Sequence, residues 1–283
     1  MSAAQRISTA SIVQGSYAFM RTATVPALTG TLIYAVVSSL GDFIRSAQVF
    51  GRQSDLVGGL LFSIMAIIWL AMSLRQGLGL PRKGLFGLDL GKDELRLGTS
   101  VLGFLFVLSI VLFLLGFTVF LLIMIVAVAG AGALGGEDVS NAELFTSPGA
   151  VRDFLSSGGA GTFVSITSGA ILTAAILSFV WLILRLLPFA AAAIDQKRFV
   201  VLQAVAWTRY QDRALIAGGL LTIGVGLTFI VVARYAISLL PLPLVGSALL
   251  VHLASCFGAL LLIGFICTVY TLLVVESDPV ESE

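Results

Sequence analysis

The sequence predicts an all-α membrane protein, a polytopic bundle of about six transmembrane helices with both termini in the cytoplasm. Of its 283 residues 58% are hydrophobic and only 11% are charged, and the mean hydropathy is +1.08. A soluble core cannot absorb that much apolar surface. The apolar residues also form six runs of about 18 or more residues, long enough to cross a hydrocarbon core of about 30 Å. Because strand-like alternation is absent throughout, a β-barrel is disfavoured.

The six apolar runs are the predicted elements, in chain order. Their approximate bounds are 25–44, 56–74, 99–129, 161–184, 214–240 and 244–275. The first opens with Pro26 near its first turn, where a missing amide hydrogen is harmless. The third is longer than a perpendicular span needs, so it should tilt or emerge at its glycine-rich end, 130–136. The fifth stops at Pro241 and Pro243, which predict a tight turn into the sixth.

The sequence predicts one integral membrane domain, 1–283. It comprises a cytoplasmic N-terminal segment (1–23), a six-span bundle (25–275) and an acidic cytoplasmic tail (276–283). Residues 1–17 lack the compact apolar segment of a cleavable signal peptide and could form a short interfacial helix. The only sizeable outer loop runs over 137–159, and its motifs specify no role.

The orientation follows from the distribution of Lys and Arg, which are retained on the cytoplasmic side of a membrane. With six spans, the N-terminal segment, the second loop and the fourth loop lie on the same side as the tail. That side carries twelve of the 16 Lys and Arg residues. We therefore expect both termini to face the cytoplasm.

The fourth loop, 185–213, combines bases and aromatic residues. On a helical wheel one side carries Phe199, Val200, Ala206, Trp207 and Tyr210, and the bases lie broadly opposite. This pattern is typical of a helix at the inner-leaflet headgroups, where each base contributes about 1 kcal/mol with anionic lipid. The candidate headgroup contacts are Arg185, Lys197, Arg198, Trp207, Arg209 and Arg213. The alternative is a loop that only fixes the topology.

A family resemblance rests on the same loop. Its residues are Arg185, Leu187-Pro188, the small-residue run Ala190 to Ala193, Ala204, Trp207 and Thr208-Arg209. This order resembles a broad bacterial family of six-span inner-membrane proteins, related to the membrane domain attached to some glycerophosphodiester phosphodiesterases. The resemblance covers roughly 183–218, and the rest agrees only in hydropathy and span count. This sequence departs from the family pattern at Tyr210-Gln211-Asp212, where the family often has Gly and an aromatic residue. The resemblance implies the fold and a bacterial plasma membrane, and no catalysis.

No motif predicts an enzyme, a metal site or a cofactor. The segment 87–93, GLDLGKD, does not match a phosphate-binding loop. Its first Gly is one residue too close to Gly91-Lys92, and Asp93 replaces the Ser or Thr that would hold magnesium. His252 is the only histidine, which excludes a His-rich metal set. Cys256 and Cys267 lie about 16 Å apart along one predicted helix, too far to pair. No nucleic-acid partner is predicted, and a homo-oligomer or a membrane-protein partner is left open.

Two ionisable side chains within the spans are candidate functional residues, because burying such groups is costly. Arg234, near the outer end of the fifth span, is expected to snorkel to the headgroups, with a cavity-lining role as the alternative. His252 is expected to make an interhelical hydrogen bond worth about 1 kcal/mol, with a proton relay as the alternative. It shares a small-residue stripe with Ala248, Ser255 and Ala259. Within the predicted spans Asp and Glu occur only near the span ends, as at Asp42. An ion-coupled transporter usually needs a carboxylate at depth, so this pattern argues against that class.

Rows of small residues predict the bundle interior. In the fifth span the row is Ala214, Gly218, Thr222 and Gly226, and in the fourth it is Gly161, Ser165, Gly169 and Thr173. Small residues at this spacing let helix backbones approach closely in a membrane. We expect both rows and the His252 stripe to face inward, and the Leu- and Phe-rich third span to face lipid.

The sequence is compatible with two functions. The first is a non-enzymatic protein that interacts with lipids or scaffolds partners at the inner leaflet. The second is a small permease or channel for a lipid-like or amphipathic solute, which requires a polar cavity at mid-membrane reached by Arg234 or His252. An intramembrane enzyme is the third interpretation.

Overall fold

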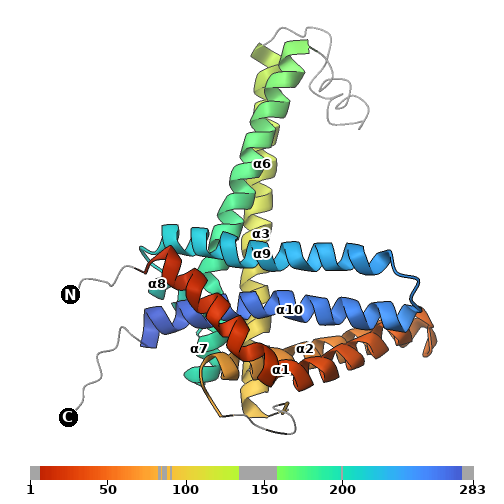
Figure 1. Ribbon diagram of the computed structural model, residues 1–283. Coiled ribbons are helices and arrows are strands. Elements are labelled where there is room, and N and C mark those ends of the chain that lie inside the picture. Colours follow the sequence, from red (N-terminus) through yellow and green to blue (C-terminus); the bar gives the residue numbers. More distant parts are fainter. Residues whose placement is uncertain are drawn as a thin grey trace, which may run out of the picture. The chain divides into compact units, whose positions relative to one another are not determined.

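The computed structural model describes residues 7–81, 84, 88, 89, 91–133, 158–198 and 200–275. This part of the chain is helical and contains no β-strand. Six of its helices are long and apolar enough to cross a membrane. They are α1 (Thr9–Ser46), α2 (Ser54–Gly77), α3 (Lys92–Ala133), α6 (Gly158–Leu186), α9 (Asp212–Ser238) and α10 (Leu244–Tyr270), shown in Figure 1. The predicted all-α class and the six spans are confirmed.

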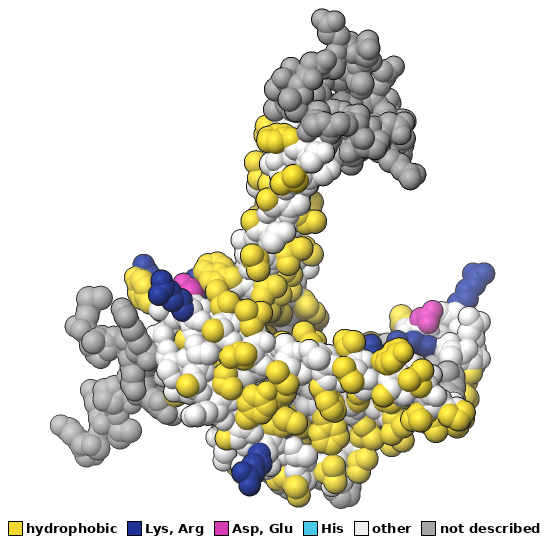
Figure 2. Space-filling view, turned by 45° about the horizontal axis from the view of Figure 1, so that its top comes forward, with side chains coloured by type: hydrophobic (Ala, Val, Ile, Leu, Met, Phe, Trp, Pro, Cys, Tyr) yellow, Lys and Arg dark blue, Asp and Glu magenta, His cyan; other side chains and the backbone are white. Residues whose placement is uncertain are grey.

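Backbone packing divides the chain into two compact units. The first is formed within residues 1–104 and 184–283, and the second within 105–183. In the second unit the apolar side chains of α3 are largely exposed, with Phe113 at 72%, as expected for a helix that faces lipid. Figure 2 shows one face of the molecule, on which hydrophobic side chains are widely spread and Lys and Arg occur in few places.

Three residues of the small-residue row of the fourth span lie on the surface of the second unit, and the burial of the fourth, Gly161, is outside the described part. Ser165, Gly169 and Thr173 on α6 are exposed. No atom lies within 4 Å of the position that a Cβ on Gly169 would occupy. The prediction is therefore wrong for these residues, because small-residue spacing permits a close contact but does not supply a partner helix.

Helix α1 begins earlier than the predicted start near residue 25. The Ser8 hydroxyl caps it by accepting from the Ser11 amide at 3.0 Å, and Ile12 and Ser16 are fully buried. Residues 9–23 thus continue into the first span. Pro26 lies inside α1 rather than in its first turn. The helix bends along its length (Figure 1), as expected because proline removes a backbone hydrogen bond and clashes with the preceding turn.

Helices α1 and α10 run antiparallel through the first unit. A Cβ on Gly264, near the end of α10, would lie 2.7 Å from the carbonyl oxygen of Ser16, near the start of α1. At the opposite end His252, near the start of α10, contacts Asp42, near the end of α1. The second half of α10 supplies much of the core, including the fully buried Phe265 and Tyr270.

The small-residue row of α9 is buried, as predicted. Its members Ala214, Gly218, Thr222 and Gly226 are all buried. A Cβ on Gly226 would lie 2.6 Å from the carbonyl oxygen of Gly258 in α10, so the two backbones are in direct contact. This is the close approach that small residues permit where lipid provides no hydrophobic drive between helices.

The loop 187–211 does not form the single amphipathic helix that the helical wheel predicted. It contains two short helices, α7 (Phe189–Asp195) and α8 (Gln203–Trp207). Six residues of α7, Phe189 to Ile194, are buried. The backbone is left-handed at Lys197 and Tyr210, with φ of 53° and 70°. Such a conformation interrupts a right-handed helix, which separates α7 from α8 and α8 from α9. Phe199 lies outside the described residues.

Candidate functional site

Four bases project from the connection between α7 and α9 and from the first turn of α9. Lys197, Arg198, Arg209 and Arg213 are exposed. Two apolar neighbours are also exposed, Leu202 at 65% and Tyr210 at 75%. The Arg209 guanidinium carbon lies 4.9 Å from the centre of the Tyr210 ring. These six residues are called the basic surface below.

The other two predicted headgroup contacts, Arg185 and Trp207, are half-buried and make contacts within the fold. The Arg185 side chain is 11% exposed, and its Nε lies 3.5 Å from Asp212 Oδ1 and donates to Thr208 Oγ1 at 3.3 Å. Trp207 packs edge-to-face on Tyr270, with ring centres 6.2 Å apart. Both residues therefore hold the loop against the bundle, and their side chains are not displayed with the four exposed bases.

A chain of hydrogen bonds anchors the basic surface to the end of α10. The buried Tyr270 hydroxyl donates to Asp195 Oδ2 at 2.5 Å and accepts from Gln196 Nε2 at 3.2 Å. Gln196 Oε1 in turn accepts from Arg198 Nε at 2.9 Å. The bases thus extend from a loop that is held to the buried Tyr270 by hydrogen bonds rather than from a free segment.

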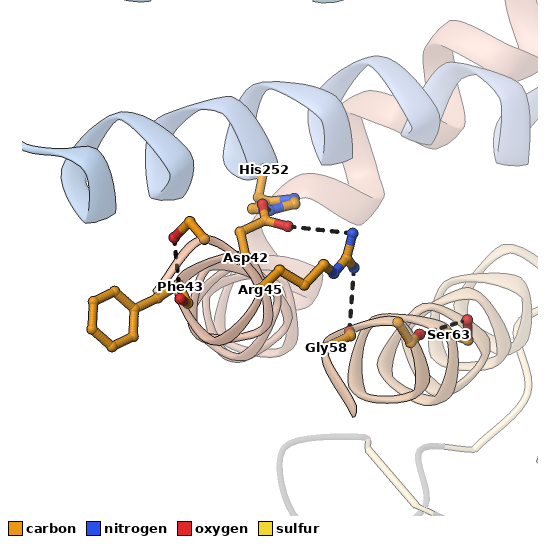
Figure 3. Close-up of polar contacts among 8 residues, drawn as sticks. Asp42, Phe43, Arg45, Gly58, Ser63 and His252 are labelled. Atoms are coloured by element: carbon orange, nitrogen blue, oxygen red, sulfur yellow. Dashed lines mark hydrogen bonds and ion pairs between the residues drawn. The ribbon is translucent and has the colours of Figure 1, made fainter. Parts of the chain in front are cut away.

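His252 and Asp42 connect α10 to α1 at the other end of this unit. His252 Nε2 and Asp42 Oδ2 lie 2.8 Å apart, so the predicted interhelical hydrogen bond is confirmed, with a partner that the sequence had not indicated. The Arg45 guanidinium lies 3.9 Å from Asp42 Oδ1 and donates to the Gly58 carbonyl on α2 at 3.2 Å. Figure 3 shows Asp42 between the imidazole and the guanidinium. Three helices are joined at this point.

Aromatic rings surround the histidine within the same cluster. The His252 ring lies edge-on to Tyr34, with centres 6.3 Å apart, and 6.1 Å from the centre of Phe62. His252 is about 12 Å along the axis from the start of α10. This depth places the polar contact within the span, close to its end.

A cavity of about 240 Å³ opens beside Asp42 between α1 and α10. Its lining comprises Ser39, Asp42, Phe43, Ser46, Val245, Ser247, Ala248 and Val251. The polar groups are thus one carboxylate and three hydroxyls, set among apolar side chains. His252 lies behind Asp42 and does not line the cavity.

A second cavity, of about 390 Å³, lies at the opposite end of the α1–α10 pair. Its polar lining includes Ser11, Thr22, Gln76 and Thr268. It adjoins the π-helical turn Thr271–Val275 that ends α10. Arg234 is exposed and lines neither of these two cavities.

Sequence reasoning missed a buried ionic cluster at the start of α3. Arg75 and Glu94 are 3% and 1% exposed, and Arg75 forms ion pairs with Glu94 and, at 2.9 Å, with Asp93. Arg96 lies 3.3 Å from Asp93 on its other side. Glu94 also accepts from the Gly91 amide at 2.9 Å, which caps the helix. The cluster fastens the end of α2 to the start of α3.

The last features to consider are possible metal ligands and the two cysteines. Within the described residues no group of three His, Cys, Asp or Glu side chains is placed to hold a metal ion. Cys256 and Cys267 are both buried and unpaired. Comparison of the chain with protein-family models, with curated proteins and with solved structures finds no match.

Proposed function

We propose that this chain is a non-enzymatic integral membrane protein of a bacterial plasma membrane that binds anionic lipid through its basic surface. The observation that carries the proposal is the exposure of four bases beside Leu202 and Tyr210. Bases on a protein with so apolar a surface are most stable at the headgroups, where anionic phosphates pair with them and neighbouring apolar side chains enter the interface. The resemblance to bacterial inner-membrane proteins supports the choice of membrane.

Contacts within the first unit support a cytoplasmic position for the basic surface. The Ile7 amide donates to Gln211 Oε1 at 3.1 Å, and Tyr270 bonds Asp195. The start of α1, the end of α10 and the fourth loop therefore lie at one end of the bundle. The base-rich loops favour the cytoplasm for that end. We infer an orientation with both termini inside.

Cysteine labelling tests the orientation. In Lys197→Cys the new thiol should react with a membrane-impermeant maleimide only in inside-out vesicles. In Gln48→Cys, placed in the exposed turn after α1, it should react only in right-side-out vesicles. Cys256 and Cys267 are buried, so the parent chain supplies a low background. Labelling with the opposite sidedness would reverse the orientation and remove the inner-leaflet proposal.

Lipid titration tests the binding. We expect purified protein to bind fluorescent phosphatidylglycerol more tightly than phosphatidylcholine. The triple variant Arg198→Gln, Arg209→Gln, Arg213→Gln should weaken phosphatidylglycerol binding by roughly a hundredfold, since each base near an anionic surface contributes about 1 kcal/mol. Its melting temperature should not change, because the three side chains are exposed.

The matched control is Arg234→Gln, which removes one exposed base outside the basic surface and should lower phosphatidylglycerol affinity by no more than about fivefold, the contribution of a single base. Equal affinity of the triple variant and the parent would refute the proposal. So would equal binding of the two lipids by the parent.

The alternative of a permease is less well supported. It requires a polar mid-membrane cavity reached by Arg234 or His252. The two cavities described above lie at opposite ends of the α1–α10 pair, and neither residue lines them. The basic surface needs no such pathway, and we therefore favour lipid binding.

A further inference from the structure

The cavity beside Asp42 has a polar wall made largely of hydrogen-bond acceptors. The Ser39 hydroxyl donates to the Ala35 carbonyl at 2.7 Å, and the Ser46 hydroxyl donates to the Phe43 carbonyl at 3.1 Å. Each hydroxyl has one proton, so these two oxygens can only accept from a ligand. A group that binds to these two oxygens must therefore bring its own donors.

Asp42 retains capacity to accept as well. Its Oδ2 is bonded to His252 Nε2 at 2.8 Å. The Arg45 guanidinium lies 3.9 Å from Oδ1, which is an ion-pair distance but too long for a hydrogen bond. Arg45 is instead hydrogen-bonded to the Gly58 carbonyl on α2. The carboxylate is thus fixed in position by the imidazole while one oxygen stays open to a donor.

We propose that this cavity binds a primary ammonium group, with Asp42 as its counter-ion and Ser39 and Ser46 as further acceptors. An ammonium has three N–H donors and one positive charge, which complement a carboxylate and two hydroxyl oxygens. A phosphate brings negative charge and acceptors, so it is disfavoured. The apolar side chains of Phe43, Val245 and Val251 fit the methylene groups that adjoin such an ammonium.

The position of the cavity suits a lipid headgroup. Its residues belong to the last turns of α1 and the first turns of α10, the level at which a spanning helix meets the headgroups. The ammonium can come from the headgroup of phosphatidylethanolamine or from a free amine such as ethanolamine. The site lies at the opposite end of α1 and α10 from the basic surface, so it is independent of that surface.

The test compares ligands that carry the same charge but differ in whether their ammonium group has N–H donors. Full-length protein in a lipid-free detergent is titrated with phosphatidylethanolamine or phosphatidylcholine, and separately with ethanolamine or choline as chloride salts. Phosphatidylethanolamine should bind at least about tenfold more tightly than phosphatidylcholine, because a quaternary ammonium has no N–H to donate. Saturation by ethanolamine, and not choline, would identify the free amine as a sufficient ligand. Binding of the lipid alone would identify the headgroup source.

Two variants remove acceptor groups of the cavity and are chosen so that the fold is retained. Asp42→Asn retains the size of the side chain and should abolish the preference for the primary ammonium. The double variant Ser39→Ala, Ser46→Ala leaves the Asp42–His252 contact in place and should weaken ammonium binding by about tenfold. The variant Arg198→Gln, Arg209→Gln, Arg213→Gln should bind both ammonium probes as the parent does. Equal affinities for phosphatidylethanolamine and phosphatidylcholine would overturn the proposal. So would an unchanged preference in Asp42→Asn together with an unchanged ammonium affinity in the double variant.

Discussion

Replacing Arg75 by Met should destabilise the protein by about 3–5 kcal/mol, the usual cost of removing one partner from a buried ion pair. Arg75 is 3% exposed and faces Glu94, which is 1% exposed. Asp93 would keep Arg96 as a partner, but Glu94 would lose the base that faces it. The measurement is the melting temperature of the purified protein in detergent, where a clear decrease is expected.

A second substitution separates loss of charge pairing from loss of packing. Adding Glu94→Gln to Arg75→Met removes the uncompensated charge and should recover part of the lost stability. Arg52→Met, at an exposed base in the α1–α2 connection, should change stability by less than about 0.5 kcal/mol. A melting temperature of Arg75→Met equal to that of Arg52→Met would show that the buried cluster does not stabilise the fold.

Replacing Gly226 by Leu should separate α9 from α10. A Cβ at this position would lie 2.6 Å from the Gly258 carbonyl oxygen, and a backbone atom cannot rotate away as a side chain can. Overpacking of this kind costs typically 1–3 kcal/mol and more where the backbone must shift. We expect a marked fall in melting temperature, measured in the same detergent as for the parent.

The same helix supplies a matched control. A Cβ on Gly224 would meet no atom within 4 Å, so Gly224→Leu should melt as the parent does. Gly218→Leu should be intermediate, because its Cβ would meet the Ile12 side chain, which has rotamers available. Equal melting temperatures for Gly226→Leu and Gly224→Leu would contradict the close contact between α9 and α10.

Hydropathy alone was sufficient to predict the fold class. In a membrane the backbone hydrogen bonds of a spanning segment must form within the segment, and charged side chains are costly there, so each span is a continuous apolar helix. Hydropathy was insufficient to predict the start of α1. Gln14 and neighbouring polar residues lower the local hydropathy, yet Ile12 and Ser16 are buried against the rest of the bundle. Whether such a segment packs depends on a partner helix near the other end of the chain, which no local pattern reveals.

The candidate sites were predictable only in part, for the same reason. The small-residue rows on α6 and α9 have the same spacing, but the row on α9 is buried whereas Ser165, Gly169 and Thr173 of the row on α6 are exposed. His252 was recognisable as a single ionisable group within a span, whereas Asp42, 210 residues away, became its partner only through folding. Likewise, six loop residues looked equivalent in the sequence, and tertiary contacts separate Arg185 and Trp207 from the four exposed bases.

Native mass spectrometry of protein extracted gently from its own membrane tests the central proposal most directly. With lipid identification, the parent should retain a defined anionic lipid, and the variant Arg198→Gln, Arg209→Gln, Arg213→Gln should lose it while remaining folded. Retention of the same anionic lipid by both proteins, or a parent that carries none, would contradict a lipid-binding role for the basic surface.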